Sequence, residues 1–186
     1  MIDETTERPI DEIRTGNASF MLPSLIDHLN FSDNVETSEV KERIKTAESA
    51  LDLGSGDGNN FFTLEKIAPE LKTIATVDVV TKPLENYIRS IAPVQVTHYP
   101  QYINQFLGES RRSYDLVVMT GVPDHGLNTE TQYANLARNV SEKGVLLETD
   151  DTRLSKREML KNFDLIVDVP HIGAPANRIW QRKATT

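Results

Sequence analysis

Short apolar runs and segments with helical spacing alternate along most of the chain, and this alternation restricts the fold more than any other feature. Runs such as Ala50–Leu53 and Tyr114–Met119 are typical of buried strands. Between them, the segment Leu84–Ile91 has apolar side chains on one helical face. Strands that alternate with helices form right-handed βαβ units. We therefore expect an α/β fold with a doubly wound, mostly parallel sheet.

The same spacing rules locate the individual elements. We expect strands at residues 50–53, 73–80, 94–97, 114–119, 144–147, 165–169 and 179–182. Helices are expected at residues 17–30, 61–68, 83–91, 101–108, 129–140 and 155–163, and the last two of these begin with capping boxes. A further short helix is expected to begin at a cap, Thr37 or Ser38, and to run to Ala47. The loop PHIGAPAN is too short for a helical crossover, which makes the last of the seven strands antiparallel.

A glycine-rich turn, DLGSGDG over residues 52–58, follows the first strand and opens a helix. Glycine allows a sharp turn and lets a ligand approach the main chain, and the helix N-terminus offers free N–H groups. In open α/β sheets a nucleotide-like ligand lies at this turn. The alternative is a merely tight connection between strand and helix, with Asp57 as the helix cap.

The spacing of the turn distinguishes between ligands. A dinucleotide fingerprint, G-x-G-x-x-G, would need a third glycine where this chain has Asn59, which makes an NAD-binding domain the least favoured reading. The Asp52 carboxylate would repel a pyrophosphate but suits a ligand that carries an ammonium and a sulfonium. Asp78 ends the second strand and is placed to accept hydrogen bonds from ribose hydroxyls.

The segments ALDLGSGDG and VDVV, with the terminal pair LIVDVP and RIWQR, resemble the Rossmann-like (class I) S-adenosylmethionine-dependent methyltransferases over residues 49–183. The resemblance implies S-adenosylmethionine as cofactor, held by Asp52, Gly54, Ser55, Gly56, Gly58, Asp78, Val79 and Thr120. Many members carry an acid near the adenine after the third strand. This chain has HYPQY there, which leaves the adenine contact unassigned, with Tyr102 or Ile103 as candidates.

The segments after the fourth and fifth strands indicate the acceptor. The chain lacks the Asn/Asp-Pro-Pro-aromatic run of amino-methyltransferases of nucleic acid bases, and it has no cysteine for cytosine-C5 chemistry. YDLVVMTGVPDHG and GVLLETDDT are similar to a bacterial group of small-molecule O-methyltransferases, in which His125 matches a histidine and Asp151 an acid. Thr120 stands where that group has its first aspartate.

We predict His125 as the general base, with Asp124 beside it in the catalytic set, because an unperturbed histidine titrates near neutral pH. A divalent cation is a further candidate cofactor, with Asp124, Asp150 and Asp151 as its oxygen ligands. The alternatives are that His125 is an ordinary loop residue and that one of the paired acids serves the following helix N-terminus. His171 is a weaker candidate.

Charge and composition restrict the partners. The net charge is −8, and it makes nucleic acid an unfavoured partner. No apolar run of about 18 residues indicates a membrane span, and the acidic start lacks a secretory signal. The absence of cysteine is compatible with a cytoplasmic protein. The sequence does not indicate an oligomeric state.

We expect residues 1–48 to form a helical segment packed on the core, and residues 49–183 to form the S-adenosylmethionine-binding domain. The predicted function is S-adenosylmethionine-dependent methyl transfer to a small molecule, at oxygen. The alternatives are methylation of a protein or RNA, and a non-catalytic module that binds the nucleoside.

Overall fold

The computed structural model describes residues 21–31, 34–56, 58, 60–79, 94–122, 126–149, 152, 154–171 and 174–184. Its strands are β1 (Ser49–Leu53), β2 (Thr73–Val77), β3 (Gln95–Tyr99), β4 (Tyr114–Thr120), β5 (Val140–Thr149), β6 (Phe163–His171) and β7 (Ala174–Arg182). They form one sheet in the order β3-β2-β1-β4-β5-β7-β6. Strands β1 to β5 pair in parallel, and β7 is antiparallel to both β5 and β6. The predicted α/β sheet of seven strands with an antiparallel last strand is confirmed.

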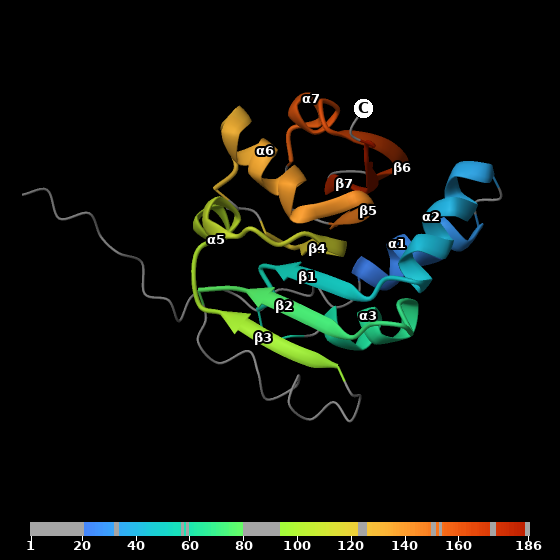
Figure 1. Ribbon diagram of the computed structural model, residues 1–186. Coiled ribbons are helices and arrows are strands. Elements are labelled where there is room, and N and C mark those ends of the chain that lie inside the picture. The colour runs from blue at the N-terminus through green and yellow to red at the C-terminus, as the bar shows by residue number, and fades with distance from the viewer. Residues whose placement is uncertain are drawn as a thin grey trace, which may run out of the picture.

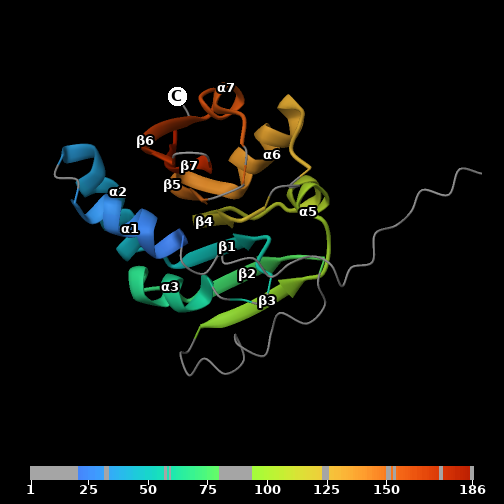
Figure 2. The ribbon, with the colours of Figure 1, turned by 180° about the vertical axis from the view of Figure 1, so that it is seen from behind.

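Helices cover both faces of this sheet (Figures 1 and 2). One group contains α1 (Met21–Phe31), α2 (Val35–Lys45) and α3 (Asn60–Ile67), and the other contains α5 (Ile103–Glu109), α6 (Glu130–Asn139) and α7 (Lys156–Met159). Because both faces are covered, the central strands are buried on both sides and read as continuous apolar runs. Among the described residues, no helix is long and apolar enough to cross a membrane.

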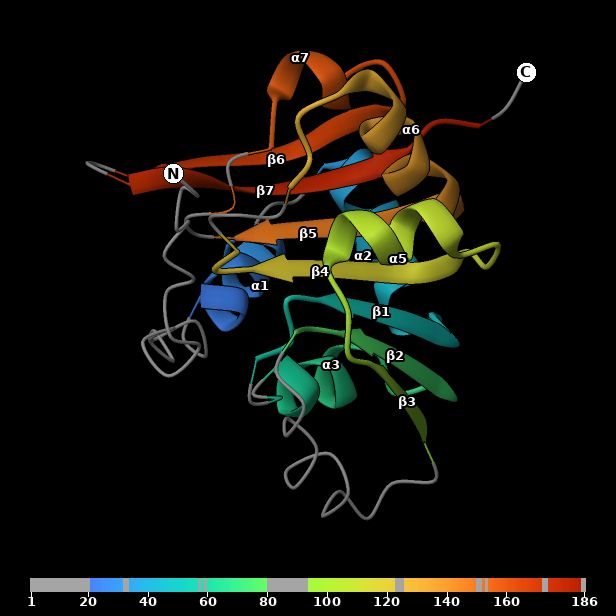
Figure 3. The ribbon, with the colours of Figure 1, turned by 90° about the vertical axis from the view of Figure 1, so that its left-hand side faces the viewer.

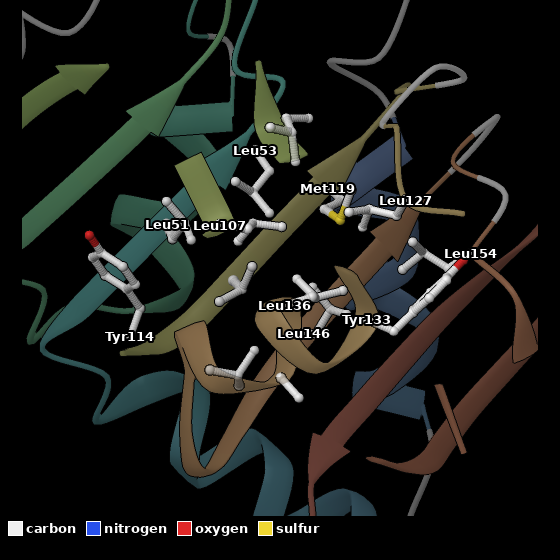
Figure 4. Close-up of a cluster of buried hydrophobic side chains, with 14 of the residues drawn as sticks. Leu51, Leu53, Leu107, Tyr114, Met119, Leu127, Tyr133, Leu136, Leu146 and Leu154 are labelled. Carbon is white, nitrogen blue, oxygen red and sulfur yellow. The ribbon is translucent and has the colours of Figure 1, made fainter. Parts of the chain in front are cut away.

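Two apolar cores lie between these helices and the sheet. The core under α5, α6 and α7 contains Leu51, Met119 and Leu146 from the strands and Leu107 and Leu136 from the helices (Figure 4). The second core, on the opposite face, contains the following side chains from α1, α2 and α3: Leu22, Leu25, Leu29, Val40, Ile44, Phe61 and Leu64. Alternate side chains of a strand enter opposite cores, so that one strand packs against both helical layers.

The start of α2 differs from the prediction. Its cap is Asn34, not Thr37 or Ser38. The Asn34 side chain accepts a hydrogen bond from Thr37 N at 2.7 Å, and the Thr37 hydroxyl accepts one from Asn34 N at 3.2 Å. In such a capping box the cap residue lies three residues before the residue with which it exchanges hydrogen bonds, which places Thr37 inside the helix. Because α1 extends to Phe31 and α2 begins at Val35, the two helices also lie closer in sequence than the predicted bounds, residue 30 and the cap at Thr37 or Ser38, had placed them.

The last helix and hairpin also differ from the prediction. The Ser155 side chain caps α7 as expected, but the helix ends at Met159 rather than near Phe163. Phe163 instead begins β6, where it pairs with Arg182 of β7. Strand pairing with a distant segment therefore prevails over the local helical pattern. Both hairpin strands extend into the segment predicted as a loop, and the predicted helix at residues 83–91 lies outside the described residues.

Candidate functional site

Three adjacent strands bring the predicted cofactor residues to one edge of the sheet. Leu53, the last residue of β1, pairs with Val77 of β2 on one side and with Met119 of β4 on the other. The glycine turn then crosses the end of β2, where Gly54 N donates to Val77 O at 2.8 Å. Figure 3 shows that β4 and β5 also end at this edge, with their arrowheads side by side. The carboxyl ends of parallel strands are where α/β folds bind ligands.

The glycines of the turn have conformations that other residues rarely adopt. The φ angle is +76° at Gly54 and +52° at Gly56. A Cβ at Gly54 would lie 2.3 Å from Val122 Cγ2, so that position packs directly against the segment after β4. A Cβ at Gly56 would meet no atom of the described residues within 4 Å, so among these residues the middle of the turn borders open space. A ligand can therefore approach the backbone at Gly56 but not at Gly54.

Ser55 lies between these two glycines and presents a polar atom that suits a ligand. Its side chain is buried, and its Oγ has no hydrogen-bond partner within the described part of the chain. A buried hydroxyl without a partner is costly, which makes it a candidate contact for a bound molecule.

A buried side-chain network lies beneath the turn. Asn60, the first residue of α3, donates from Nδ2 to Asp52 Oδ1 at 3.0 Å and to Thr120 Oγ1 at 2.7 Å. All three side chains are buried. The network therefore joins the end of β1, the start of α3 and the end of β4, and it fixes the orientation of the Asp52 carboxylate.

Sequence reasoning missed Asn60, although a signal was present. It lies four residues before Leu64 and next to Phe61, and both of these side chains are buried. The helical spacing therefore placed an amide on the face directed at the sheet. A buried amide requires partners, and Asp52, eight residues earlier in the buried strand β1, was an available acceptor.

Asp78 also contacts the turn. Its Oδ2 accepts a hydrogen bond from Gly56 N at 2.9 Å, and its own N–H donates to Tyr99 O at 3.3 Å. The carboxylate therefore lies at the rim of the turn, beside the half-buried Val79. Of the two candidate adenine contacts, Tyr102 is 68% exposed and Ile103 is buried.

The segments after β4 and β5 are tied together. Gly121 N donates to Thr149 O at 3.3 Å, and Val122 N donates to Thr152 Oγ1 at 3.1 Å. The segment after β4 is thus held against the glycine turn on one side and against the end of β5 on the other.

Several candidate residues lie outside the part of the chain that the structure describes: Asp57, Asp124, His125, Asp150 and Asp151. Their roles as helix cap, general base, catalytic partner and metal ligands remain predictions. Within the described ranges, no group of three or more histidines and acids could hold a metal ion. His171 ends β6 rather than lying in a hairpin loop.

A fully buried acid, Glu148, lies one residue before the end of β5. Its carboxylate accepts hydrogen bonds from Trp180 Nε1 at 2.8 Å and Leu154 N at 3.1 Å, and it forms a 3.4 Å ion pair with Arg178. Burial raises the pKa of Glu148 to about 7, whereas the Trp180 hydrogen bond and the Arg178 charge act to lower it. Sequence reasoning missed this acid because the signal was a single glutamate within an apolar strand.

The comparisons with known proteins agree with this architecture. No model of a protein family matches the sequence, and neither does any curated protein. Among solved structures, the StiE O-MT protein (residues 961–1257) has a TM-score of 0.62 at 12% identity, covering 88% of this chain and 75% of that one. The yhhF protein of Escherichia coli, provisionally described as a methyltransferase, has a TM-score of 0.58 at 16% identity, covering 80% and 82%.

A third similar structure contains a bound nucleoside. It is the 1,6-didemethyltoxoflavin-N1-methyltransferase of Burkholderia thailandensis, solved with its substrate and S-adenosylhomocysteine. Its TM-score is 0.51 at 13% identity, covering 88% of this chain and 87% of that one. Together with the strand order, these likenesses show that the chain has the Rossmann-like fold of class I S-adenosylmethionine-dependent methyltransferases.

Proposed function

We propose that this protein transfers a methyl group from S-adenosylmethionine to a hydroxyl oxygen of a small molecule. The observation that carries the proposal is the position of Asp52. Its buried carboxylate lies at the base of a glycine turn whose middle borders open space, at the carboxyl edge of this fold. An acid at that place favours a cationic ligand and disfavours a pyrophosphate.

The residues at the turn fit the parts of this cofactor. Asp52 would attract the positively charged methionine end. The buried Ser55 hydroxyl, which has no partner among the described residues, and the backbone at Gly56, on the open side of the turn, offer polar contacts. The Asp78 carboxylate, at the rim, would accept hydrogen bonds from the ribose hydroxyls, with Val79 beside it. Thr120 supports this arrangement through Asn60.

When bound, S-adenosylmethionine supplies an electrophilic methyl group on its sulfonium. The protein aligns the acceptor for in-line attack and removes the proton from the acceptor hydroxyl as the new bond forms. We assign the removal of that proton to His125 as general base, with Asp124 next to it in the catalytic set. Both follow Val122, which packs against Gly54 of the turn and donates to Thr152, so a base at the next positions would lie close to the methyl group.

A small acceptor is supported by two observations. The net charge of −8 opposes binding of nucleic acid. The similar structures include an O-MT protein and a methyltransferase solved with bound 1,6-didemethyltoxoflavin. A divalent cation held by Asp124, Asp150 and Asp151 remains a further candidate for positioning an acceptor oxygen.

Calorimetric titration tests the ligand class. S-adenosylmethionine should bind, and NAD should not. Asp52→Asn should weaken S-adenosylmethionine binding at least tenfold, whereas Asp27→Asn, an exposed aspartate of α1, should leave it unchanged. Binding of NAD alone, or equal affinity in the wild type and Asp52→Asn, would contradict the proposal.

A screen of hydroxylated small molecules for methyl transfer then tests the chemistry. His125→Ala should abolish turnover while leaving the affinity for S-adenosylmethionine unchanged. Retained turnover would remove His125 from the mechanism. Tight cofactor binding without any methyl transfer would favour the non-catalytic module.

A further inference from the structure

One cavity in the described part of the chain is lined by no residue of the glycine turn. Its volume is about 330 Å³, and it is lined by Tyr99, Gln101, Phe106, Glu109, Ser110, Arg111, Arg112 and Tyr114. Tyr114 is the first residue of β4 and Thr120 is the last. At a rise of about 3.3 Å per residue, the two ends of the strand are about 20 Å apart. The cavity therefore extends to the opposite end of β4 from the proposed methyl-transfer site.

Two unpaired cations line this cavity. Arg111 and Arg112 are exposed, and neither forms an ion pair within the part of the chain that the structure describes. The one acid of the lining, Glu109, accepts a hydrogen bond from Gln105 Nε2 at 3.2 Å. Among the described residues, no carboxylate therefore forms an ion pair with either of these two adjacent guanidiniums. Their planar donors suit bidentate contact with a carboxylate or a phosphate.

Tyr114 provides a further polar group. The residue is 4% exposed, and its hydroxyl has no hydrogen-bond partner within the described ranges. Figure 4 shows the hydroxyl at the outer side of the leucine cluster, pointing away from Leu136 and Leu146. Burial raises the pKa of this hydroxyl, as does the neighbouring Tyr99, so it stays protonated and able to donate. A buried hydroxyl without a partner calls for an acceptor that the described chain does not supply.

An aromatic wall completes the cavity. The rings of Tyr99 and Phe106 lie 4.9 Å apart between centroids, with their planes tilted by 54°. Such a pair offers an apolar surface against which a planar ring packs. The cavity thus combines aromatic faces, two adjacent cations and a hydrogen-bond donor.

We propose that this cavity binds a small aromatic anion, with the ring against Tyr99 and Phe106 and the anionic group on Arg111 and Arg112. The Tyr114 hydroxyl donates to the same anionic group. The anionic end of this site, at Arg111, Arg112 and Tyr114, contains no side chain of the turn or of the segment after β4, whereas Tyr99 borders the proposed cofactor site through the hydrogen bond from Asp78 N to Tyr99 O.

The test uses benzoate as probe and benzyl alcohol as its neutral counterpart, with binding followed by amide chemical shifts in ¹⁵N-labelled protein. Benzoate should shift signals within residues 99–114 saturably, with at least tenfold higher affinity than benzyl alcohol. The double variant Arg111→Gln/Arg112→Gln should weaken benzoate at least tenfold. Arg157→Gln, an exposed arginine of α7, serves as the matched control and should leave the affinity unchanged.

Tyr114→Phe gives a second test that does not depend on the arginines. It should weaken benzoate severalfold without lowering the stability of the free protein, because the hydroxyl it removes has no partner there. Equal affinity for benzoate and benzyl alcohol, unchanged binding to the double arginine variant, or shifts spread over other basic surfaces would overturn the proposal. Added S-adenosylmethionine is not needed, so failure of the methyltransferase proposal would not affect this result.

Discussion

The buried Glu148 should make the stability of this protein fall as the pH rises. The pKa of an ordinary glutamate is 4.5, whereas burial raises that of Glu148 to about 7 in the folded chain. Below pH 4.5 the carboxyl is protonated in both states and has no effect on stability. Between pH 4.5 and 7 the unfolded chain releases the proton and the folded chain retains it, so the folded state loses stability. Above pH 7 the loss is complete.

The size of this effect follows from the two pKa values. At about 1.4 kcal/mol for each pH unit, their difference corresponds to about 3 kcal/mol in total. Most of it, about 2–3 kcal/mol, should develop between pH 5 and pH 8. This is a substantial part of the stability of a single domain, which is typically about 5–15 kcal/mol.

Urea unfolding of the wild type and of Glu148→Gln at pH 5 and pH 8 measures this contribution. Glutamine keeps the shape but cannot ionise, so the free energy of unfolding of the variant, relative to the wild type, should rise by about 2–3 kcal/mol from pH 5 to pH 8. Glu142→Gln, an exposed position of the same strand, should show no such change. The reasoning would be refuted if the difference in free energy of unfolding between Glu148→Gln and the wild type were the same at pH 5 and pH 8 to within about 0.5 kcal/mol. Such a result would mean that the bonds from Trp180 and Arg178 keep the carboxylate ionised.

Two further variants test the turn and the network beneath it. Gly54→Ala should destabilise the fold by at least roughly 1–2 kcal/mol, the cost of a left-handed non-glycine residue, and should abolish S-adenosylmethionine binding. Val122→Ala in the same chain should restore part of the stability, because it relieves the 2.3 Å contact but not the +76° φ angle. Additive effects of the two substitutions in urea unfolding would contradict this. Asn60→Ala should cost about 2–4 kcal/mol in urea unfolding and weaken S-adenosylmethionine binding in calorimetry, because it leaves buried acceptors on two strands without their donor. The control Asn139→Ala, at a buried amide that bonds only to backbone carbonyls of the helical layer, should lower stability without changing cofactor affinity.

The order of strands and helices could be read from the sequence because it depends on local periodicity. The apolar run at residues 50–53 and the glycines after it predict a strand and a turn from the local sequence alone. The short connection before β7 was enough to make that strand antiparallel, as the structure confirms. Element ends were less predictable, since Asn34 and Phe163 take their positions from a cap and a strand partner rather than from hydrophobic spacing.

The contacts within the candidate site depended on the tertiary structure. Asn60 and Thr120 are 60 residues apart, and Glu148 and Trp180 are 32 apart, so no local pattern indicates that either pair meets. Strand register decides both contacts, because it places the ends of β1 and β4 side by side and sets Glu148 opposite Arg178. Residue type alone determined that Asp52 is acidic and that the glycines after it can adopt the positive φ angles of the turn. Burial among distant side chains determined how that acid is oriented, and it made Glu148 the acid whose pKa is raised.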